Sequence, residues 1–252
     1  MKNAVFILVL IFFSCKNENQ VIFEDNFESN EINLKYWNFE LGNGCPNLCG
    51  WGNNEKQFYT KQNASIKNGK LVIKATKNDS NYYASKLTTK NKIEFQYGSV
   101  EVRAKLPQGK GLWPAIWMLG SDIDSKTWPA CGEIDIMEYV GKAPHKIHTT
   151  LHTPDSFGNS KNTKITTIEN IENGFHTYKI NWTKNDITFF IDDKEVYVFA
   201  PKEKNDKTWP FNKPFYIILN LAIGGNFGGP EIDNSIFPQE FIIDYVRVVK
   251  LK

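Results

Sequence analysis

The stretch G-E-I-D-I-M-E-Y-V, residues 132–140, places three carboxylates among apolar and β-branched neighbours. This composition favours a half-buried strand over a helix. Successive side chains of a strand point to opposite faces, so Glu133 and Asp135 share a face, whereas Glu138 would point the other way. A β-bulge at Met137 restores the parity. The stretch therefore predicts a bulged strand that carries all three carboxylates on one face.

The bulge also sets the distance between the two glutamates. Four strand steps separate the α-carbons of Glu133 and Glu138 by roughly 13 Å. Inward-leaning side chains, each reaching about 4 Å, leave roughly 5 Å between the carboxyls, close to the ~5–5.5 Å of retaining glycosidases. Three carboxylates this close cannot all ionise freely, so at least one pKa is expected to rise. The pattern is that of a nucleophile and a general acid; the alternative is a solvated acidic strand face.

Two tryptophans lie just upstream, in G-L-W-P-A-I-W-M-L-G, residues 111–120. Trp113 and Trp117 share a face if this segment is a strand, although Pro114 interrupts the strand pattern. Core packing is one interpretation of the pair. Stacking of the indole rings on sugars is the other.

These two stretches closely resemble glycoside hydrolase family 16, in particular its bacterial laminarinases, which are endo-β-1,3-glucanases. The likeness covers nearly the whole mature chain and continues in G-W-G-N-N-E-K-Q-F-Y-T (50–60), Y-G-S-V-E-V-R-A-K-L-P (97–107), P-F-Y-I-I-L-N-L-A-I-G-G (214–225) and D-Y-V-R-V (244–248). It implies cleavage of a laminarin-like β-1,3-glucan with retention of anomeric configuration. The extra Met137 resembles the bulged laminarinase pattern, whereas lichenase-type relatives have E-x-D-x-E. The alternatives are a mixed-linkage β-1,3/1,4-glucanase, a galactanase, or a non-catalytic glucan-binding protein of the same fold.

The resemblance implies a role for each carboxylate and no catalytic cofactor. Glu133 would be the nucleophile that attacks the anomeric carbon. Glu138 would protonate the leaving oxygen and later activate water, and Asp135 would tune the protonation of the nucleophile.

The resemblance also implies residues that contact the glucan, namely Trp113, Trp117, Asn53, Arg103 and His152. The alternatives for the last three are a turn residue, a surface ion pair and a structural histidine. Family members often carry a structural calcium on the convex face. The matching positions here are Glu24, Gly69 and Asp244, and a glycine carbonyl is a reasonable calcium ligand.

The remainder of the chain reads as short strands separated by turns, with a hairpin turn at residues 192–194. Strand composition recurs in residues 21–27, 70–75, 99–105, 146–153, 176–182, 187–191, 195–199, 215–223 and 241–249. No convincing amphipathic helix interrupts them. The pattern predicts an all-β sandwich of jelly-roll type, and the resemblance implies two curved antiparallel sheets with a concave glycan cleft.

The N-terminus predicts export. Lys2, the apolar run 4–13 and Ser14 form a short signal, too short for a membrane-spanning helix. Cys15 resembles the acylated cysteine of a bacterial lipoprotein, and residues 16–20 would be a tether; an ordinary cleaved signal is the alternative. The enzyme would thus be secreted or lipid-anchored in the cell envelope.

Three further cysteines leave their pairing open. Cys45 and Cys49 could close a small-loop disulfide, but pairings with Cys131 also fit an exported protein. Zinc is the weaker alternative, because His148 and His152 lie on an expected strand, roughly 13 Å apart, and could not share an ion.

Composition predicts one soluble catalytic domain over residues 21–252, with a β-glucan as its partner. The formal net charge of +2 gives no electrostatic reason for nucleic-acid binding. A monomer is the default expectation.

Overall fold

The computed structural model describes residues 20–251, so the expected signal at 1–15, Cys15 and most of the tether lie outside the described residues. The described chain consists mainly of strands: β1 (Val21–Asp25), β2 (Asn38–Glu40), β3 (Gln57–Tyr59), β4 (Ala64–Ile66), β5 (Leu71–Asn78), β6 (Asn81–Ala84), β7 (Lys86–Thr88), β8 (Gly98–Lys105), β9 (Leu112–Gly120), β10 (Glu133–Tyr139), β11 (Lys146–His152), β12 (Thr163–Thr167), β13 (His176–Trp182), β14 (Ile187–Ile191), β15 (Lys194–Phe199), β16 (Phe215–Ile223) and β17 (Gln239–Val249). Its short helices are η1 (Cys49–Gly52), α1 (Gly225–Gly228) and η2 (Asn234–Ile236).

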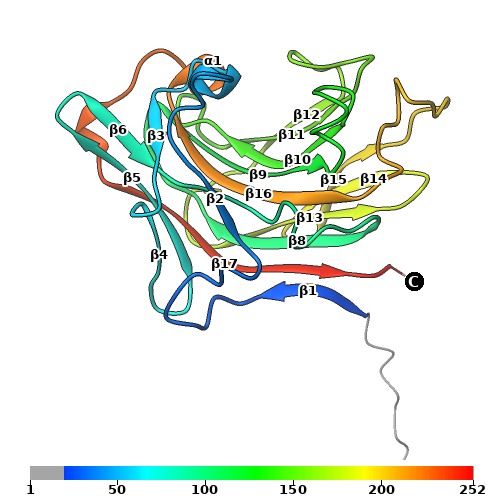
Figure 1. Cartoon of the computed structure of the whole chain (residues 1–252), viewed down its shortest axis with the longest axis horizontal. Helices are drawn as coiled ribbons and strands as arrows, with labels where there is room; N and C mark the ends of the chain where they lie inside the picture. Colours follow the sequence, from blue (N-terminus) through cyan, green and yellow to red (C-terminus); the bar gives the residue numbers. More distant parts are fainter. Residues whose placement is uncertain (1–19, 252) are drawn as a thin grey trace, which may run out of the picture.

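Two sheets pack face to face (Figure 1). The ten-stranded sheet has the order β15-β14-β13-β8-β17-β5-β6-β3, with β1 beside β17 and β4 beside β5. The seven-stranded sheet has the order β12-β11-β10-β9-β16-β7-β2, and its strands curve upward in Figure 1, with α1 above one end. The predicted jelly-roll sandwich is confirmed. The departure from antiparallel pairing is β3 beside β6, which run parallel.

Each segment predicted as a strand forms one. The predicted hairpin turn joins β14 to β15 through Asp192 and Asp193, whose φ angles are 49° and 61°. Positive φ at both central residues is the type I′ geometry that matches the twist of a two-residue hairpin.

Alternation along the strands supplies one core between the sheets. In β8, Val100, Val102 and Ala104 are fully buried, whereas Glu101, Arg103 and Lys105 are half-exposed on the other face. The same alternation operates in the seven-stranded sheet, and its inward residues join the same hydrophobic cluster. The outward faces of the two sheets therefore lie on opposite sides of the molecule.

Strand β9 runs through Pro114 without a break. Pro114 pairs with Leu221 of β16, while the register of β9 with β10 ends at Ala115 opposite Glu138. Proline has no backbone N–H to donate. Pro114 lies just beyond the last residue of β9 that pairs with β10, so the hydrogen bonds between these two strands do not require a donor at this position.

Among residues 20–251, no helix is both long and apolar enough to cross a bilayer.

Candidate active site

The predicted bulge is present in β10. On β9, Leu119 pairs with Glu133 and Ala115 with Glu138, so a five-residue step on β10 matches a four-residue step on β9. The same offset appears against β11, where His152 and His148 are the partners of the two glutamates.

The extra residue is accommodated on the core side. Ile136 and Met137 are both buried in the hydrophobic cluster. Glu133, Asp135 and Glu138 consequently share the outward face of the seven-stranded sheet, which we call the acidic face. The parity argument made from the sequence is confirmed.

Cross-strand neighbours shape the surroundings of the three carboxylates. Trp117 on β9 lies directly opposite Asp135, and the small Ala115 lies opposite Glu138. Trp113, two positions further along the same face of β9, donates its indole N–H to Glu138 Oε1 at 3.0 Å. Both predicted tryptophans therefore lie on the acidic face, half-buried beside the carboxylates.

A third tryptophan contacts the other glutamate. Trp128 donates its indole N–H to Glu133 Oε2 at 2.8 Å, and its ring lies 5.3 Å from that of Phe157 and 5.7 Å from that of His152. Trp128 is 41% exposed and Phe157 50%. Each glutamate thus has its own indole donor. Trp128 stands in the W-P-A-C-G-E-I-D motif, but nothing in its spacing predicts this contact.

Burial and mutual repulsion perturb the three acids. Burial, and then the charge of Asp135, raises the pKa of Glu133 to about 8. Burial, and then the charge of Glu133, raises the pKa of Glu138 to about 7. The pKa of Asp135 is raised well above its usual range by burial and by Glu138. The group therefore retains protons near neutral pH, as expected for carboxylates that share one site.

The predicted histidine lies at the same place. His152 Nε2 is 3.6 Å from Glu133 Oε1 and 3.2 Å from Asp135 Oδ2. Only 9% of His152 is exposed.

Asn53 reaches the acidic face through a chain of hydrogen bonds. Trp117 donates to Asn220 at 2.7 Å, Asn220 to Tyr59 at 2.9 Å, Tyr59 to Glu55 at 3.1 Å, and Asn53 to Glu55 at 3.3 Å. Burial raises the pKa of Glu55. Lys86 lies beside this network, with Nζ 4.4 Å and 5.1 Å from the ring centroids of Trp51 and Trp117, and 2.7 Å from Glu40 Oε2.

The glycine-rich segment after β16 borders the other end of the acidic face. Phe227 of α1 packs edge-on against Trp113 at 5.4 Å and against His148 at 4.9 Å. Glycine at position 225 lets the start of α1 lie against the backbone of Asn53, because its φ is +82° and an added Cβ would lie 2.8 Å from the Asn53 carbonyl oxygen. Burial lowers the pKa of His148.

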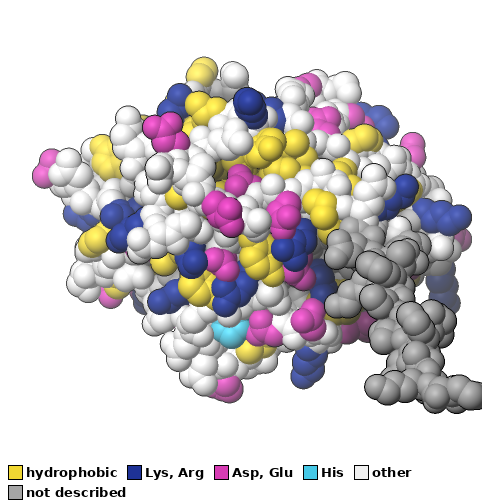
Figure 2. All heavy atoms as spheres, turned by 90° about the horizontal axis from the view of Figure 1, so that it is seen from below, with side chains coloured by type: hydrophobic (Ala, Val, Ile, Leu, Met, Phe, Trp, Pro, Cys, Tyr) yellow, Lys and Arg dark blue, Asp and Glu magenta, His cyan; other side chains and the backbone are white. Residues whose placement is uncertain are grey.

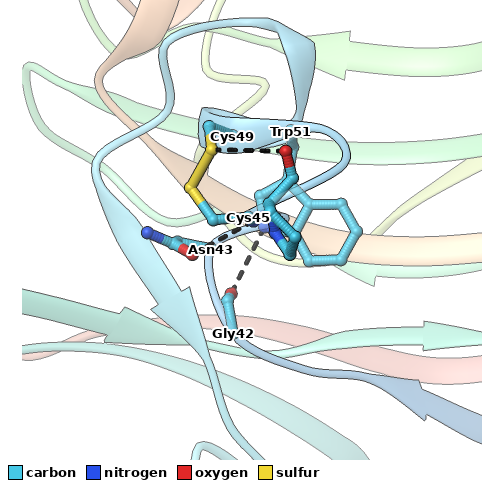
Figure 3. The surroundings of a disulfide bond; sticks show 6 residues. Gly42, Asn43, Cys45, Cys49 and Trp51 are labelled. Carbon is cyan, nitrogen blue, oxygen red and sulfur yellow. Dashed lines mark hydrogen bonds between the residues drawn. A yellow bond between two sulfur atoms is a disulfide. The ribbon is translucent and has the colours of Figure 1, made fainter.

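The structure pairs Cys45 with Cys49 and leaves Cys131 as a buried free thiol (Figure 3). The disulfide closes the loop that leads into η1. Trp51 donates its indole N–H to the Gly42 carbonyl at 3.3 Å within this loop. The disulfide therefore lies in the segment that presents Trp51 and Asn53.

Arg103 requires a correction, because the structure does not bring it to the acidic face. Strand β8 belongs to the ten-stranded sheet, and alternation turns Arg103 outward there. Its guanidinium contacts Asp244 and lies 4.8 Å from the ring centroid of Phe175. Figure 2 shows this side of the molecule, where acidic and basic side chains intermingle. Among the described residues, Lys86 is the cation that lies on the Trp117 side of the acidic face.

The positions matched to calcium lie on the ten-stranded sheet. Lys70 Nζ is 2.7 Å from Asp244 Oδ1, which brings Asp244 beside the turn that contains Gly69. The Gly69 carbonyl accepts no hydrogen bond from any described residue. The Glu24 carboxylate is held by Arg247, at 2.6 Å and 2.7 Å. The Gly69 carbonyl suits an oxygen-loving cation, whereas both carboxylates already have counter-ions: Asp244 pairs with Lys70 and Arg103, and Glu24 with Arg247.

A curved β-sandwich that carries two glutamates on one sheet face among tryptophan side chains is the arrangement of a class of enzyme, the glycoside hydrolases. The sequence of this chain matches the family model of glycosyl hydrolases family 16 over residues 52–245. The chain therefore belongs to glycosyl hydrolases family 16.

Individual relatives agree with this assignment. A solved laminarinase from Flavobacterium sp. UMI-01 is 57% identical, with a TM-score of 0.90 over 92% of this chain and 100% of that structure. A β-glucanase from Rhodothermus marinus is 36% identical over 92% of this chain and 85% of its own length. Glucan endo-1,3-beta-glucosidase A1 from Niallia circulans is 38% identical over 91% of this chain, but this chain spans only 38% of that protein.

Proposed function

We propose that the protein is an endo-β-1,3-glucanase that hydrolyses laminarin-like glucan with retention of anomeric configuration. The observation that carries the proposal is the common face of Glu133 and Glu138, four strand positions apart on the partner strands. Inward-leaning side chains at this spacing leave roughly 5 Å between the carboxyls, near the ~5–5.5 Å of retaining enzymes. The named relatives support β-1,3-glucan as the substrate.

The proposed reaction has two displacements. Glu133 attacks the anomeric carbon while the bond to the glycosidic oxygen breaks and Glu138 donates its proton to that oxygen. Water then attacks the same carbon, Glu138 takes a proton from the water, and the bond to Glu133 breaks. Asp135, whose pKa is raised well above its usual range by burial and by the charge of Glu138, would share a proton with the Glu133 carboxylate and so tune its protonation.

The sugars would lie on the aromatic side chains of the acidic face. Trp113, Trp117 and Trp128 offer indole rings beside the three carboxylates, which suits stacking on pyranose faces. We assign Asn53 and His152 hydrogen bonds to sugar hydroxyls, and their contacts with residues at the acidic face support this role.

The test of the reaction compares laminarin, lichenan and agarose by release of reducing ends, with the anomeric configuration of the first product followed by NMR. We expect laminarin to be the best substrate and the β-anomer to appear first. Preference for lichenan would favour a mixed-linkage enzyme, and binding without hydrolysis would favour a non-catalytic glucan-binding protein. Glu133→Gln should lose at least about a thousandfold in kcat while still binding glucan. Exposed Glu195→Gln is the matched control.

We also propose a structural calcium near Gly69 and Asp244. The Gly69 carbonyl, which accepts no hydrogen bond from the described residues, supports it, and the ion would take the place of Lys70 and Arg103 beside the Asp244 carboxylate. Calcium would stabilise the fold without entering catalysis, so EDTA should lower the melting temperature and added CaCl2 should restore it. An EDTA-treated protein with the original melting curve would rule it out.

Export, the lipid anchor and a monomeric state are further proposals. The basic, apolar and small-residue order before Cys15 supports export with acylation. Radiolabelled palmitate should enter the wild-type protein and not Cys15→Ala. Strands of both sheets contribute to one hydrophobic cluster, which supports a single catalytic domain over residues 21–252. Light scattering of the mature protein should give the mass of one chain.

A further inference from the structure

An imidazole and two carboxylates converge at the Glu133 end of the acidic face. His152 Nε2 lies 3.6 Å from Glu133 Oε1 and 3.2 Å from Asp135 Oδ2. One ligand atom from each residue lies within 4.8 Å of those from the other two. We call Glu133, Asp135 and His152 the ligand triad.

Two separations within the ligand triad, both from His152 Nε2, are close to the edges of a tetrahedral zinc site. Zinc binds imidazole nitrogen and carboxylate oxygen at about 2.0–2.2 Å, so adjacent ligands in a tetrahedron lie about 3.3–3.6 Å apart. The two measured separations, 3.2 Å and 3.6 Å, span this range. Three protein ligands leave a fourth position for water.

A buried polar atom points independently to a cation. Asp135 is only 3% exposed, and its Oδ2 has no hydrogen-bond partner among the described residues. Leaving such an oxygen unpaired in the interior is costly, and a bound cation would satisfy it. The same oxygen is the one closest to His152 Nε2.

We propose that the ligand triad binds a zinc ion and that the bound ion inhibits hydrolysis. The ion takes the lone pairs of the Glu133 carboxylate and of His152, so glucan and zinc compete for the same space. The set of one nitrogen and two oxygens suits zinc rather than calcium or magnesium, which prefer six or more oxygen ligands. His152 Nδ1 has no partner among the described residues. A histidine that holds a resident zinc normally donates its other ring N–H to a carboxylate, a carbonyl or water. Because His152 Nδ1 has no such acceptor among the described residues, we assign the ligand triad a zinc that binds reversibly and inhibits.

Calorimetric titration of the mature protein with ZnCl2, in buffer containing CaCl2, tests binding. We expect one zinc per chain, and His152→Gln should raise the Kd by more than about a hundredfold, since loss of even a residue that only orients a metal ligand costs about 10–100-fold in affinity. His176→Gln is the matched control, because His176 pairs with Asp192 on the other sheet at 2.6 Å. Equal zinc affinity in wild type and His152→Gln, including no binding by either, would overturn the proposal.

Kinetics with laminarin test the inhibition, and this part rests on the proposed glucanase function. Zinc should raise KM with kcat unchanged, EDTA should reverse the effect, and MgCl2 at the same concentration should have none. Zinc that lowers kcat at saturating laminarin, or zinc without effect, would contradict a shared site. If laminarin is not hydrolysed at all, the glucanase proposal fails, while the calorimetry still decides whether the ligand triad binds zinc.

Discussion

At the scale of single residues, the site depends on carboxylates that are partly deprived of water. Glu133, Asp135 and Glu138 lie within one sheet face, and burial raises the pKa of all three. A carboxylate whose pKa is raised by folding destabilises the folded state once it ionises. The three carboxylates should therefore lower the stability of the folded protein, a trade of stability for reactivity that is usual at active sites.

Glu133→Gln should make this cost visible. The unfolded-state pKa of Glu is about 4.3, and the folded-state pKa is raised to about 8. Between these values the folded protein binds the proton more tightly, so wild-type stability falls as pH rises through this window. Glutamine has no proton to lose. The melting temperature of Glu133→Gln should rise relative to that of the wild type from pH 4 to pH 8, whereas that of Glu195→Gln should follow the wild type at every pH. A difference in melting temperature that does not depend on pH would contradict the assigned pKa shift.

The two indole donors should act on different limbs of the pH–rate profile. Hydrogen bonds from Trp128 and Trp113 lower the pKa of Glu133 and Glu138 respectively. Trp128→Phe keeps a ring but removes the donor to Glu133, so the limb of kcat/KM that reports Glu133 should move to higher pH. Trp113→Phe removes the donor to Glu138 and should instead move the limb that reports Glu138 to higher pH. Each variant is the control for the other, and identical shifts would show that the donors are not separate.

The sequence alone identified the three carboxylates and the two β9 tryptophans as site residues, because strand parity and motif spacing are local properties. It did not identify Trp128, Lys86 or Asn220. Their contacts depend on which strands and loops become neighbours across the sheet, and no spacing in the chain encodes that.

At the scale of elements, the bulge of β10 decides which way Glu138 faces. It exists because five residues separate the glutamates, and an odd step reverses the face on a regular strand. The bulge was predictable, because the carboxylates had to share a face to act together. The continuity of β9 through Pro114 was not, because it depends on where the register with β10 ends.

Deletions at Met137 test the parity argument. Deleting Met137 leaves an even step of four between the glutamates, so a regular strand keeps both on the acidic face. We expect this variant to retain measurable hydrolysis with a lower melting temperature, because a fully buried side chain is lost. Deleting Ile136 together with Met137 leaves an odd step of three and no extra residue to form the bulge, so it should turn Glu138 into the core and abolish activity. Circular dichroism should establish folding in both, and a folded single-deletion variant as inactive as the double deletion would refute the argument.

At the scale of the whole molecule, the outward faces of the two sheets differ in character. The seven-stranded sheet carries the acidic face, and the outward face of the ten-stranded sheet carries interleaved ion pairs (Figure 2). The jelly-roll class followed from the run of short strands. Placing Arg103 required the three-dimensional strand order, because a strand pattern shows which residues share a face but not which sheet the strand joins.

Arg103→Ala should separate stability from catalysis. Arg103 is 38% exposed in its pair with Asp244, so its loss should cost at most about 1 kcal/mol. In a chain of this size that lowers the melting temperature by up to about 4 °C. KM for laminarin should stay within about twofold of wild type, whereas Asn53→Ala should raise it several-fold. A larger change in KM in Arg103→Ala than in Asn53→Ala would show that Arg103 contacts the substrate.

The buried thiol next to β10 has a practical consequence for labelling. Burial, and then the charge of Glu133, raises the pKa of Cys131 to about 12, and Cys45 and Cys49 are joined to each other. Maleimides and iodoacetamides react with thiolates, which Cys131 hardly forms at neutral pH. A cysteine engineered at an exposed site of the mature domain would therefore be the one that takes up a fluorophore or spin label, with no need to remove Cys131 first.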